Sequence, residues 1–132
     1  MKADEKNCTV VVCDDQKAFR DVVSLMLSIE PGLEVVGEAK DGEEAVRVVT
    51  SLRPDIVLLD IAMPMLDGFE ALPLIREAAP ETQVVMLTGF NSSGMRERAL
   101  RGGAASYIEK GTDVTALVAH IKSLCAAPPS RN

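Results

Sequence analysis

Five short apolar runs alternate along this chain with segments whose apolar residues recur every three or four positions. After the valine-rich run at 9–13, apolar residues follow with helical spacing at Phe19, Val22, Val23 and Met26. The other runs occupy residues 33–37, 56–59, 84–87 and 105–108. Continuous apolar strands that alternate with helices are typical of a parallel sheet covered on both faces. The alternation therefore predicts one α/β domain built from five βα units.

The size and charge of the chain exclude several classes of protein. With 132 residues, 47% of them hydrophobic, it has room for one such domain. No apolar run reaches the roughly 18–20 residues of a membrane span, and the N-terminus lacks a secretory signal. A net charge of −6 disfavours direct contact with nucleic acid or anionic membranes. We expect a cytoplasmic domain at 8–126, an N-terminal extension at 1–7, and a tail or linker start at 127–132.

Two of the predicted helices contain residues that disfavour a helical backbone. Pro73 lies inside the third helix and is tolerable if that helix begins no earlier than about Phe69. The fourth helix, expected at 91–102, contains Gly94 and has few strong helix signals. The arginines of the fourth helix could form a partner-binding face, but Glu97 dilutes their charge and we expect a solvated face; they are Arg96, Arg98 and Arg101.

The three cysteines do not suggest a disulfide or a zinc site. Cys8 and Cys13 are five residues apart and would face opposite sides of a strand. Cys125 is distant in sequence, and the chain has no C-x-x-C pair. We expect three buried or half-buried residues that act as small hydrophobes.

Polar residues follow four of the predicted strands. Asp14 and Asp15 come after the first, Asp60 after the third, Thr88 after the fourth and Lys110 after the fifth. In an open α/β sheet, ligands bind outside the carboxyl ends of the strands, where the strand order reverses. Each residue alone is an ordinary polar strand end. If the strand order is 2-1-3-4-5, together they predict one pocket with carboxylates, a hydroxyl and an ammonium.

Such a pocket suits phosphoryl transfer. Clustered carboxylates repel one another, so they require a cation, and an incomplete cage of oxygen ligands suits Mg²⁺. Lys110 and Thr88 would contact phosphoryl oxygens. An aspartate can itself accept the phosphoryl group as an acyl phosphate.

The residues at these strand ends carry a resemblance to a known family. The acidic pair, the stretch D-x-x-M-P-x-x-D-G from Asp60 to Gly68, the pair Thr88-Gly89, and Lys110 resemble the response-regulator receiver (CheY-like) family. The resemblance runs from about Cys8 to Cys125. It implies a flavodoxin-like doubly wound sandwich with strand order 2-1-3-4-5. It also implies a phosphoacceptor switch of a two-component system, which assists its own phosphorylation and dephosphorylation but is not an enzyme.

The same resemblance implies residue roles. Asp60 would take the phosphoryl group from a sensor histidine kinase or a phosphotransfer protein. The Mg²⁺ ligands would be Asp14, mostly through water, together with Asp15, Asp60 and the Ala62 carbonyl. The groups around the phosphoryl oxygens would be those of Thr88, Lys110, Ala62 and Gly89. Thr88 would draw inward on phosphorylation, and the Tyr107 ring would fill the vacated space and change the surface formed by helix 4, strand 5 and helix 5.

The chain departs from the family pattern in the loops around the site. Gly111 follows Lys110 where many receivers have a cis proline, and glycine permits that turn without a cis bond. Ala62 and Phe90 stand at the variable positions beside the phosphoryl group, and neither can orient an attacking water by a hydrogen bond. We therefore expect slow self-dephosphorylation.

Two other functions compete with the switch. A Mg²⁺-dependent phosphohydrolase would usually have a second acid two residues after the nucleophile, where this chain has Ala62, and would need a capping domain. A degenerate receiver could act as a phosphorylation-independent interaction module, but the acidic pair, Asp60, Thr88 and Lys110 are all present. The output has two alternatives: a stand-alone receiver, which could form a homodimer, or the receiver portion of a transcriptional regulator that would reach DNA only through another domain.

Overall fold

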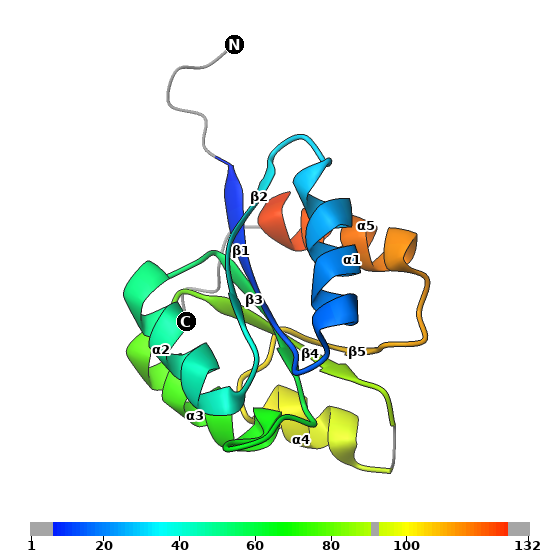
Figure 1. Ribbon diagram of the computed structural model, residues 1–132. Coiled ribbons are helices and arrows are strands. Elements are labelled where there is room, and N and C mark those ends of the chain that lie inside the picture. The colour runs from blue at the N-terminus through cyan, green and yellow to red at the C-terminus, as the bar shows by residue number, and fades with distance from the viewer. Residues whose placement is uncertain (1–6, 91–92, 127–132) are drawn as a thin grey trace.

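The computed structural model describes residues 7–90 and 93–126, and its centre is a five-stranded parallel sheet in the order β2-β1-β3-β4-β5 (Figure 1). The strands are β1 (Cys8–Cys13), β2 (Leu33–Ala39), β3 (Ile56–Asp60), β4 (Gln83–Thr88) and β5 (Ser106–Glu109). The helices are α1 (Lys17–Ser28), α2 (Gly42–Leu52), α3 (Gly68–Ala78), α4 (Met95–Arg101) and α5 (Val114–Ala126). The predicted fold class and strand order are confirmed. The expected extension up to residue 6 and the tail at 127–132 lie outside the described residues.

The sheet separates two layers of helices, which Figure 1 shows on opposite sides of the strands. Helices α1 and α5 pack on one face through Val23, Leu27, Leu117 and Ile121. Helices α2, α3 and α4 cover the other face through buried alanine, valine, leucine and isoleucine side chains. The strand residues 56–59 have no exposed area because both faces are covered. This double coverage explains their continuous apolar sequence.

The apolar stripe of α1 is rotated from the predicted one. Val22 is 52% exposed, whereas Val23 and Leu27 are fully buried. Phe19 and Met26 are partly buried against the same core. Two adjacent valines lie about 100° apart on a helix, so periodicity alone did not determine which of them faces the sheet.

Helix α3 begins at a capping box, because the Asp67 carboxylate accepts from the Glu70 amide and the Glu70 carboxylate accepts from the Asp67 amide. Its first residue is Gly68, one position before the predicted limit. Pro73 is therefore the sixth helical residue, beyond the first turn, where the ring removes an internal hydrogen bond. The condition that the sequence set on the helix start is thus missed by one residue, and packing of Ala71, Leu72 and Ile75 holds the helix.

Helix α4 is short. It begins at Met95, after Gly94 with a φ of 86°, and ends at Arg101. The predicted start at residue 91 lies outside the described residues, and the described part of the segment is a turn up to Gly94. Glycine adopts this left-handed backbone without a steric penalty, so Gly94 precedes the helix instead of lying within it.

The prediction that the cysteines stay unpaired is wrong for two of them. Cys8 and Cys125 form a disulfide with an Sγ–Sγ distance of 2.08 Å and a Cα–Cα distance of 5.9 Å. Packing of α5 against the start of β1 brings together two residues 117 positions apart. Cys13 is a buried free thiol, as expected.

Among the described residues, no helix combines the length and the apolar composition that a membrane crossing requires.

Candidate functional site

The predicted polar residues lie at the ends of four strands, along one edge of the sheet. In the parallel register Cys13 pairs with Leu59 and Asp60 pairs with Leu87, so Asp14, Asp60 and Thr88 follow one another across the edge. Thr88 pairs with Glu109, which places Lys110 beside them. The structure therefore brings together residues from β1, β3, β4 and β5, as the strand-end pattern predicted.

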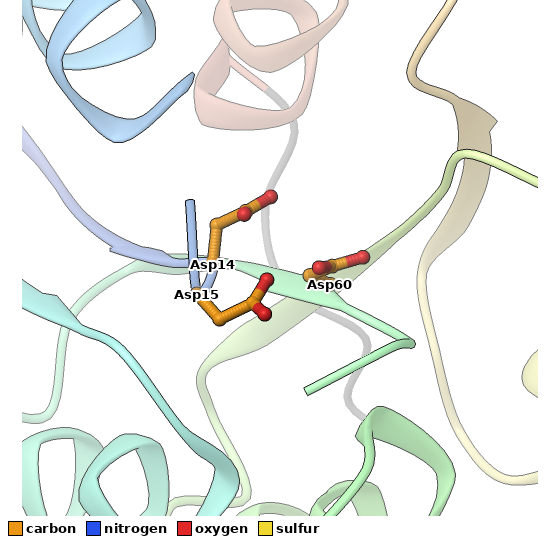
Figure 2. A group of neighbouring side chains, drawn as sticks. All are labelled: Asp14, Asp15 and Asp60. Carbon is orange, nitrogen blue, oxygen red and sulfur yellow. The ribbon is translucent and has the colours of Figure 1, made fainter. Parts of the chain in front are cut away.

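Three carboxylates form the centre of this edge (Figure 2). One oxygen from each of Asp14, Asp15 and Asp60 lies within 4.8 Å of the others. Asp14 and Asp60 are buried, with 0% and 2% exposure, and Asp15 is exposed. Like charges at such distances repel strongly, so this arrangement favours a cation among the oxygens.

Lys110 compensates part of the negative charge. Its Nζ lies 2.6 Å from Asp14 Oδ2 and 3.6 Å from Asp60 Oδ2, and the side chain is 16% exposed. The Lys110 ammonium also lies 4.5 Å from the centre of the Phe19 ring, which covers it from α1. The sequence placed Phe19 in a core stripe but carried no signal for this second contact.

Asp14 Oδ1 and the Asp14 main-chain oxygen accept hydrogen bonds, whereas Oδ2 accepts none from the described part of the chain. Its Oδ1 accepts from the Gln16 amide at 2.8 Å, and its main-chain oxygen accepts from Arg20 at 2.7 Å. Buried Oδ2 touches Lys110 but accepts no hydrogen bond of good geometry from the described residues. A buried carboxylate oxygen without a hydrogen bond is costly, and a cation ligand would satisfy it. The donor set therefore fits a hard divalent ion.

The environment of Asp60 disfavours its charged form. Burial, and after it the negative charge of Asp14, raise the pKa of Asp60 to about 6 against the opposing effects of Lys110 and the Ala62 amide. The Ala62 amide lies 3.4 Å from Asp60 Oδ1, a weak hydrogen bond. Any added cation would favour the ionised carboxylate.

The loop after Asp60 is set by a close backbone approach. The Gly68 amide donates to the Ile61 carbonyl at 2.8 Å. A Cβ at Gly68 would lie 2.7 Å from the Asp60 carbonyl oxygen and 2.8 Å from Ile61 Cα, so only glycine fits. The D-G pair thus holds the start of α3 against the end of β3.

A pocket of about 370 Å³ opens above the carboxylates. It is lined by Asp15, Gln16, Asp60, Ile61, Ala62, Thr88, Gly89, Phe90, Met95 and Lys110. The sequence pattern did not predict the contribution of Gln16 or Met95. Phe90 is 75% exposed, and the rim of the pocket at Phe90 is therefore apolar.

The Thr88 hydroxyl is engaged by its own loop. It donates to the Phe90 carbonyl at 2.5 Å and accepts from the Phe90 amide at 3.0 Å. The Tyr107 ring is already buried, with 3% exposure. Burial raises the pKa of the Tyr107 hydroxyl, and a side-chain hydrogen bond with Thr88 opposes this shift. The Tyr107 ring is therefore already buried while the Thr88 hydroxyl is still bonded to its own loop.

All three arginines of α4 are exposed, as expected, and two of them also contact neighbouring elements. Arg96 donates to the Tyr107 carbonyl at 3.2 Å and lies 5.4 Å from its ring centre. The Arg98 guanidinium lies 4.0 Å from the Phe69 ring centre on α3. Two of the three arginines thus tie α4 to its neighbours, a contact that depends on tertiary packing.

Comparison with known proteins identifies this constellation. A family model of the response regulator receiver domain matches residues 10–122. The chain belongs to the response regulator receiver family. The predicted resemblance is thereby confirmed.

The receiver is similar to parts of longer regulators. It is 34% identical over 121 residues to the transcriptional regulatory protein DegU of Brevibacillus brevis, covering 92% of this chain and 51% of that protein. It is 36% identical over 117 residues to the response regulator GacA of Pseudomonas viridiflava, covering 89% of this chain and 55% of that protein. The chain spans about half the length of these curated relatives.

Solved structures show the same fold. The response regulator domain of CheB from Thermotoga maritima superposes with a TM-score of 0.84 at 33% identity, covering 94% of this chain and all of that one. A chain of the CheX–CheY–BeF3–Mg²⁺ complex from Borrelia burgdorferi gives a TM-score of 0.83 at 28% identity, covering 89% and 88%. As a receiver, the chain has a phosphoacceptor role in two-component signalling. Receivers bind Mg²⁺ in an acidic pocket and interact with histidine kinases and phosphotransfer proteins.

Proposed function

We propose that Asp60 is the phosphoacceptor of this receiver. The observation that carries the proposal is the position of its carboxylate, within 4.8 Å of two other carboxylates and 3.6 Å from Lys110, at the floor of an open pocket. In the step, an Asp60 oxygen attacks phosphorus and the bond from phosphorus to the donor nitrogen or oxygen breaks. An acyl phosphate results, and the donor leaves with the bonding electron pair.

The ligands for Mg²⁺ in this proposal are Asp15, Asp60, the Ala62 carbonyl and, through water, Asp14. When bound, the ion would neutralise charge on the phosphoryl oxygens and on the attacking carboxylate. Asp14 Oδ2, which accepts no hydrogen bond and contacts only the Lys110 ammonium among the described residues, and the convergence of three carboxylates support this ligand set. No sulfur or imidazole group belongs to the cluster, which favours a hard ion.

The remaining contacts to the phosphoryl oxygens would come from residues that line the pocket. Lys110 supplies a positive charge that already reaches Asp60, while Thr88, Ala62 and Gly89 line the same pocket. The main-chain amide of Ala62 points at Asp60 and offers one donor. These groups together can satisfy several phosphoryl oxygens.

The switch would begin at Thr88. To donate to a phosphoryl oxygen, its hydroxyl must leave the Phe90 carbonyl, which changes the loop that leads to α4. Because the Tyr107 ring is already buried, the change transmitted to α4 and β5 would come from this loop and from the Arg96 contact with Tyr107. Partner proteins, or a second copy of the chain in a homodimer, would bind to that surface.

The test is intact mass after incubation with Mg²⁺ and acetyl phosphate. The wild-type chain should gain one phosphoryl group, and the gain should be lost in Asp60→Ala and in the presence of a chelator. A mass gain that persists in Asp60→Ala would contradict the assignment of Asp60.

The alternative is a phosphorylation-independent interaction module. In that case neither acetyl phosphate nor beryllofluoride would bind the wild-type protein. Binding of beryllofluoride without reaction with acetyl phosphate would show instead that the site is formed and that another donor is required. The intact set of Asp14, Asp15, Asp60, Thr88 and Lys110 favours the switch.

The natural donor would be a sensor histidine kinase or a phosphotransfer protein, and the site of action the cytoplasm. The relatives named as transcriptional regulators support a role in transcription for the whole protein, with DNA contacted by a segment other than this acidic domain.

A further inference from the structure

The disulfide joins the first residue of β1 to the last turn of α5, at the strand starts and so at the edge of the sheet opposite to the carboxylates. Cys8 and Cys125 are both half-buried, so solvent reaches this region. Cys13, at the other end of the same strand, has no exposed area. The three cysteines therefore divide into a reachable pair and an enclosed thiol.

Contacts other than the S–S bond also hold the two segments that carry the pair. Lys122 of α5 contacts the Glu30 carboxylate at 3.0 Å, and the Gln83 side chain donates to the Leu124 carbonyl at 3.2 Å. The Cys8 amide donates to the Gly32 carbonyl at 2.7 Å. These contacts hold both chain segments in place, so reduction would leave the two thiols close enough to react again.

We propose that Cys8 and Cys125 are a site of reversible thiol–disulfide exchange with low-molecular-weight disulfides of the glutathione type, and that the bond controls how firmly the end of α5 is anchored to the sheet. A cysteine thiolate attacks one sulfur of the glutathione disulfide and releases one glutathione thiolate. The second cysteine thiolate attacks the resulting mixed disulfide and releases the other. Overall, the protein dithiol is oxidised by two electrons, glutathione disulfide is reduced to two thiols, and the two cysteine protons pass to the released thiolates through solvent.

The third cysteine does not compete. Cys13 has no exposed area, so a glutathione disulfide cannot reach its sulfur in the folded protein. The exchange is therefore restricted to the reachable pair.

The experiment equilibrates the full chain with glutathione buffers from fully reduced to fully oxidised, quenches in acid, unfolds the protein and labels all free thiols with a maleimide. Intact mass should change from three labels to one in a single reversible transition, with the protein monomeric throughout. Peptide mapping should place the remaining label on Cys13. Cys8→Ser and Cys125→Ser lack the second thiol, so in oxidising buffer each should change from two labels to one label and one bound glutathione, whereas the matched control Cys13→Ala should change from two labels to none.

Three labels at every glutathione ratio, or a bond between two chains, would overturn the proposal. Amide hydrogen exchange provides the second readout: the last turn of α5 should exchange at least about tenfold more slowly in the oxidised form. Equal exchange in both forms would refute the anchoring role. Neither readout requires phosphorylation, so these results are independent of the test of Asp60.

Discussion

At the scale of single residues, Asp60 shows how burial and charge act together. Its carboxylate is nearly inaccessible, lies beside Asp14, and has only a weak hydrogen bond from Ala62. Its pKa is raised to about 6 by burial first and by Asp14 second. Removal from water and repulsion therefore make the ionised form costly when no metal is bound.

This shift predicts a pH-dependent stability. The folded state keeps a proton on Asp60 that the unfolded state releases, so the free energy of unfolding falls as pH rises from 3.8 to about 6. In chelator at pH 7.5, Asp60→Asn should therefore be more stable than wild type, by about 1–2 kcal/mol after solvent screening is considered. The difference should shrink towards pH 4. Urea unfolding measures it, with Glu34→Gln at an exposed position of β2 as the control.

The residue two positions after Asp60 predicts the lifetime of the phosphoryl group. Ala62 has no side-chain hydrogen-bonding group to orient water, although it lines the pocket. In Ala62→Asn the amide should position a water molecule and shorten the lifetime about tenfold, equivalent to about 1.4 kcal/mol. Loss of the phosphoryl mass with time, after removal of acetyl phosphate, tests this. An unchanged lifetime would contradict the hypothesis of slow self-dephosphorylation.

At the scale of elements, the site depends on how loops join strands to helices. The β3–α3 loop passes so close to β3 that Gly68 has no room for a side chain. Helix α4 has only seven residues and no side-chain cap, and the arginine contacts to Phe69 and Tyr107 help to hold it. A helix this short has few local interactions to stabilise it, so it can move at a low cost in free energy.

Gly68→Ala should displace the loop that carries Ala62. The added Cβ meets the Asp60 carbonyl at 2.7 Å, so the backbone must move, at a cost of about 1–3 kcal/mol in stability. Phosphorylation by acetyl phosphate should slow in parallel. The matched control is Gly111→Ala, where a Cβ would have nothing within 4 Å. Equal rates in the two variants would show that the close approach does not position the site.

Arg98→Gln should loosen α4 without affecting the pocket. The change removes the guanidinium 4.0 Å from the Phe69 ring centre, a contact of about 0.5–1 kcal/mol at an exposed site. Hydrogen exchange of the α4 amides should increase severalfold, while labelling of Asp60 by acetyl phosphate persists. Arg47→Gln on the exposed face of α2 is the control. If hydrogen exchange of α4 is unchanged in Arg98→Gln, the contact between Arg98 and the Phe69 ring does not restrain this helix.

At the scale of the whole molecule, the disulfide closes almost the entire chain into one loop. In the chain-entropy model a cross-link over 117 residues stabilises the folded state by about 5 kcal/mol, since it restricts the unfolded chain. Dithiothreitol should therefore lower the free energy of unfolding of the wild type by about 3–5 kcal/mol. Denaturation in urea with and without reductant measures this, and Cys8→Ser should show no effect of reductant. If the urea unfolding curve of the wild type is the same with and without reductant, the prediction is contradicted.

The sequence by itself determined the fold class and the positions of the polar strand ends, and its resemblance to the receiver family supplied the strand order. Strand and helix periods are local properties, and parallel strands always bring their carboxyl ends to one edge. The meeting of Asp14, Asp15, Asp60, Thr88 and Lys110 therefore followed from a pattern that needs no coordinates.

Only the tertiary structure decided the contacts between elements distant in sequence. Which valine of α1 faces the sheet depends on how the helix is rotated, and the Cys8–Cys125 bond depends on where α5 packs. Phe19 over Lys110 and Arg98 over Phe69 have the same origin. A local pattern records which face of an element is apolar, but the partner of a side chain is set by packing over the whole chain, which no short window contains.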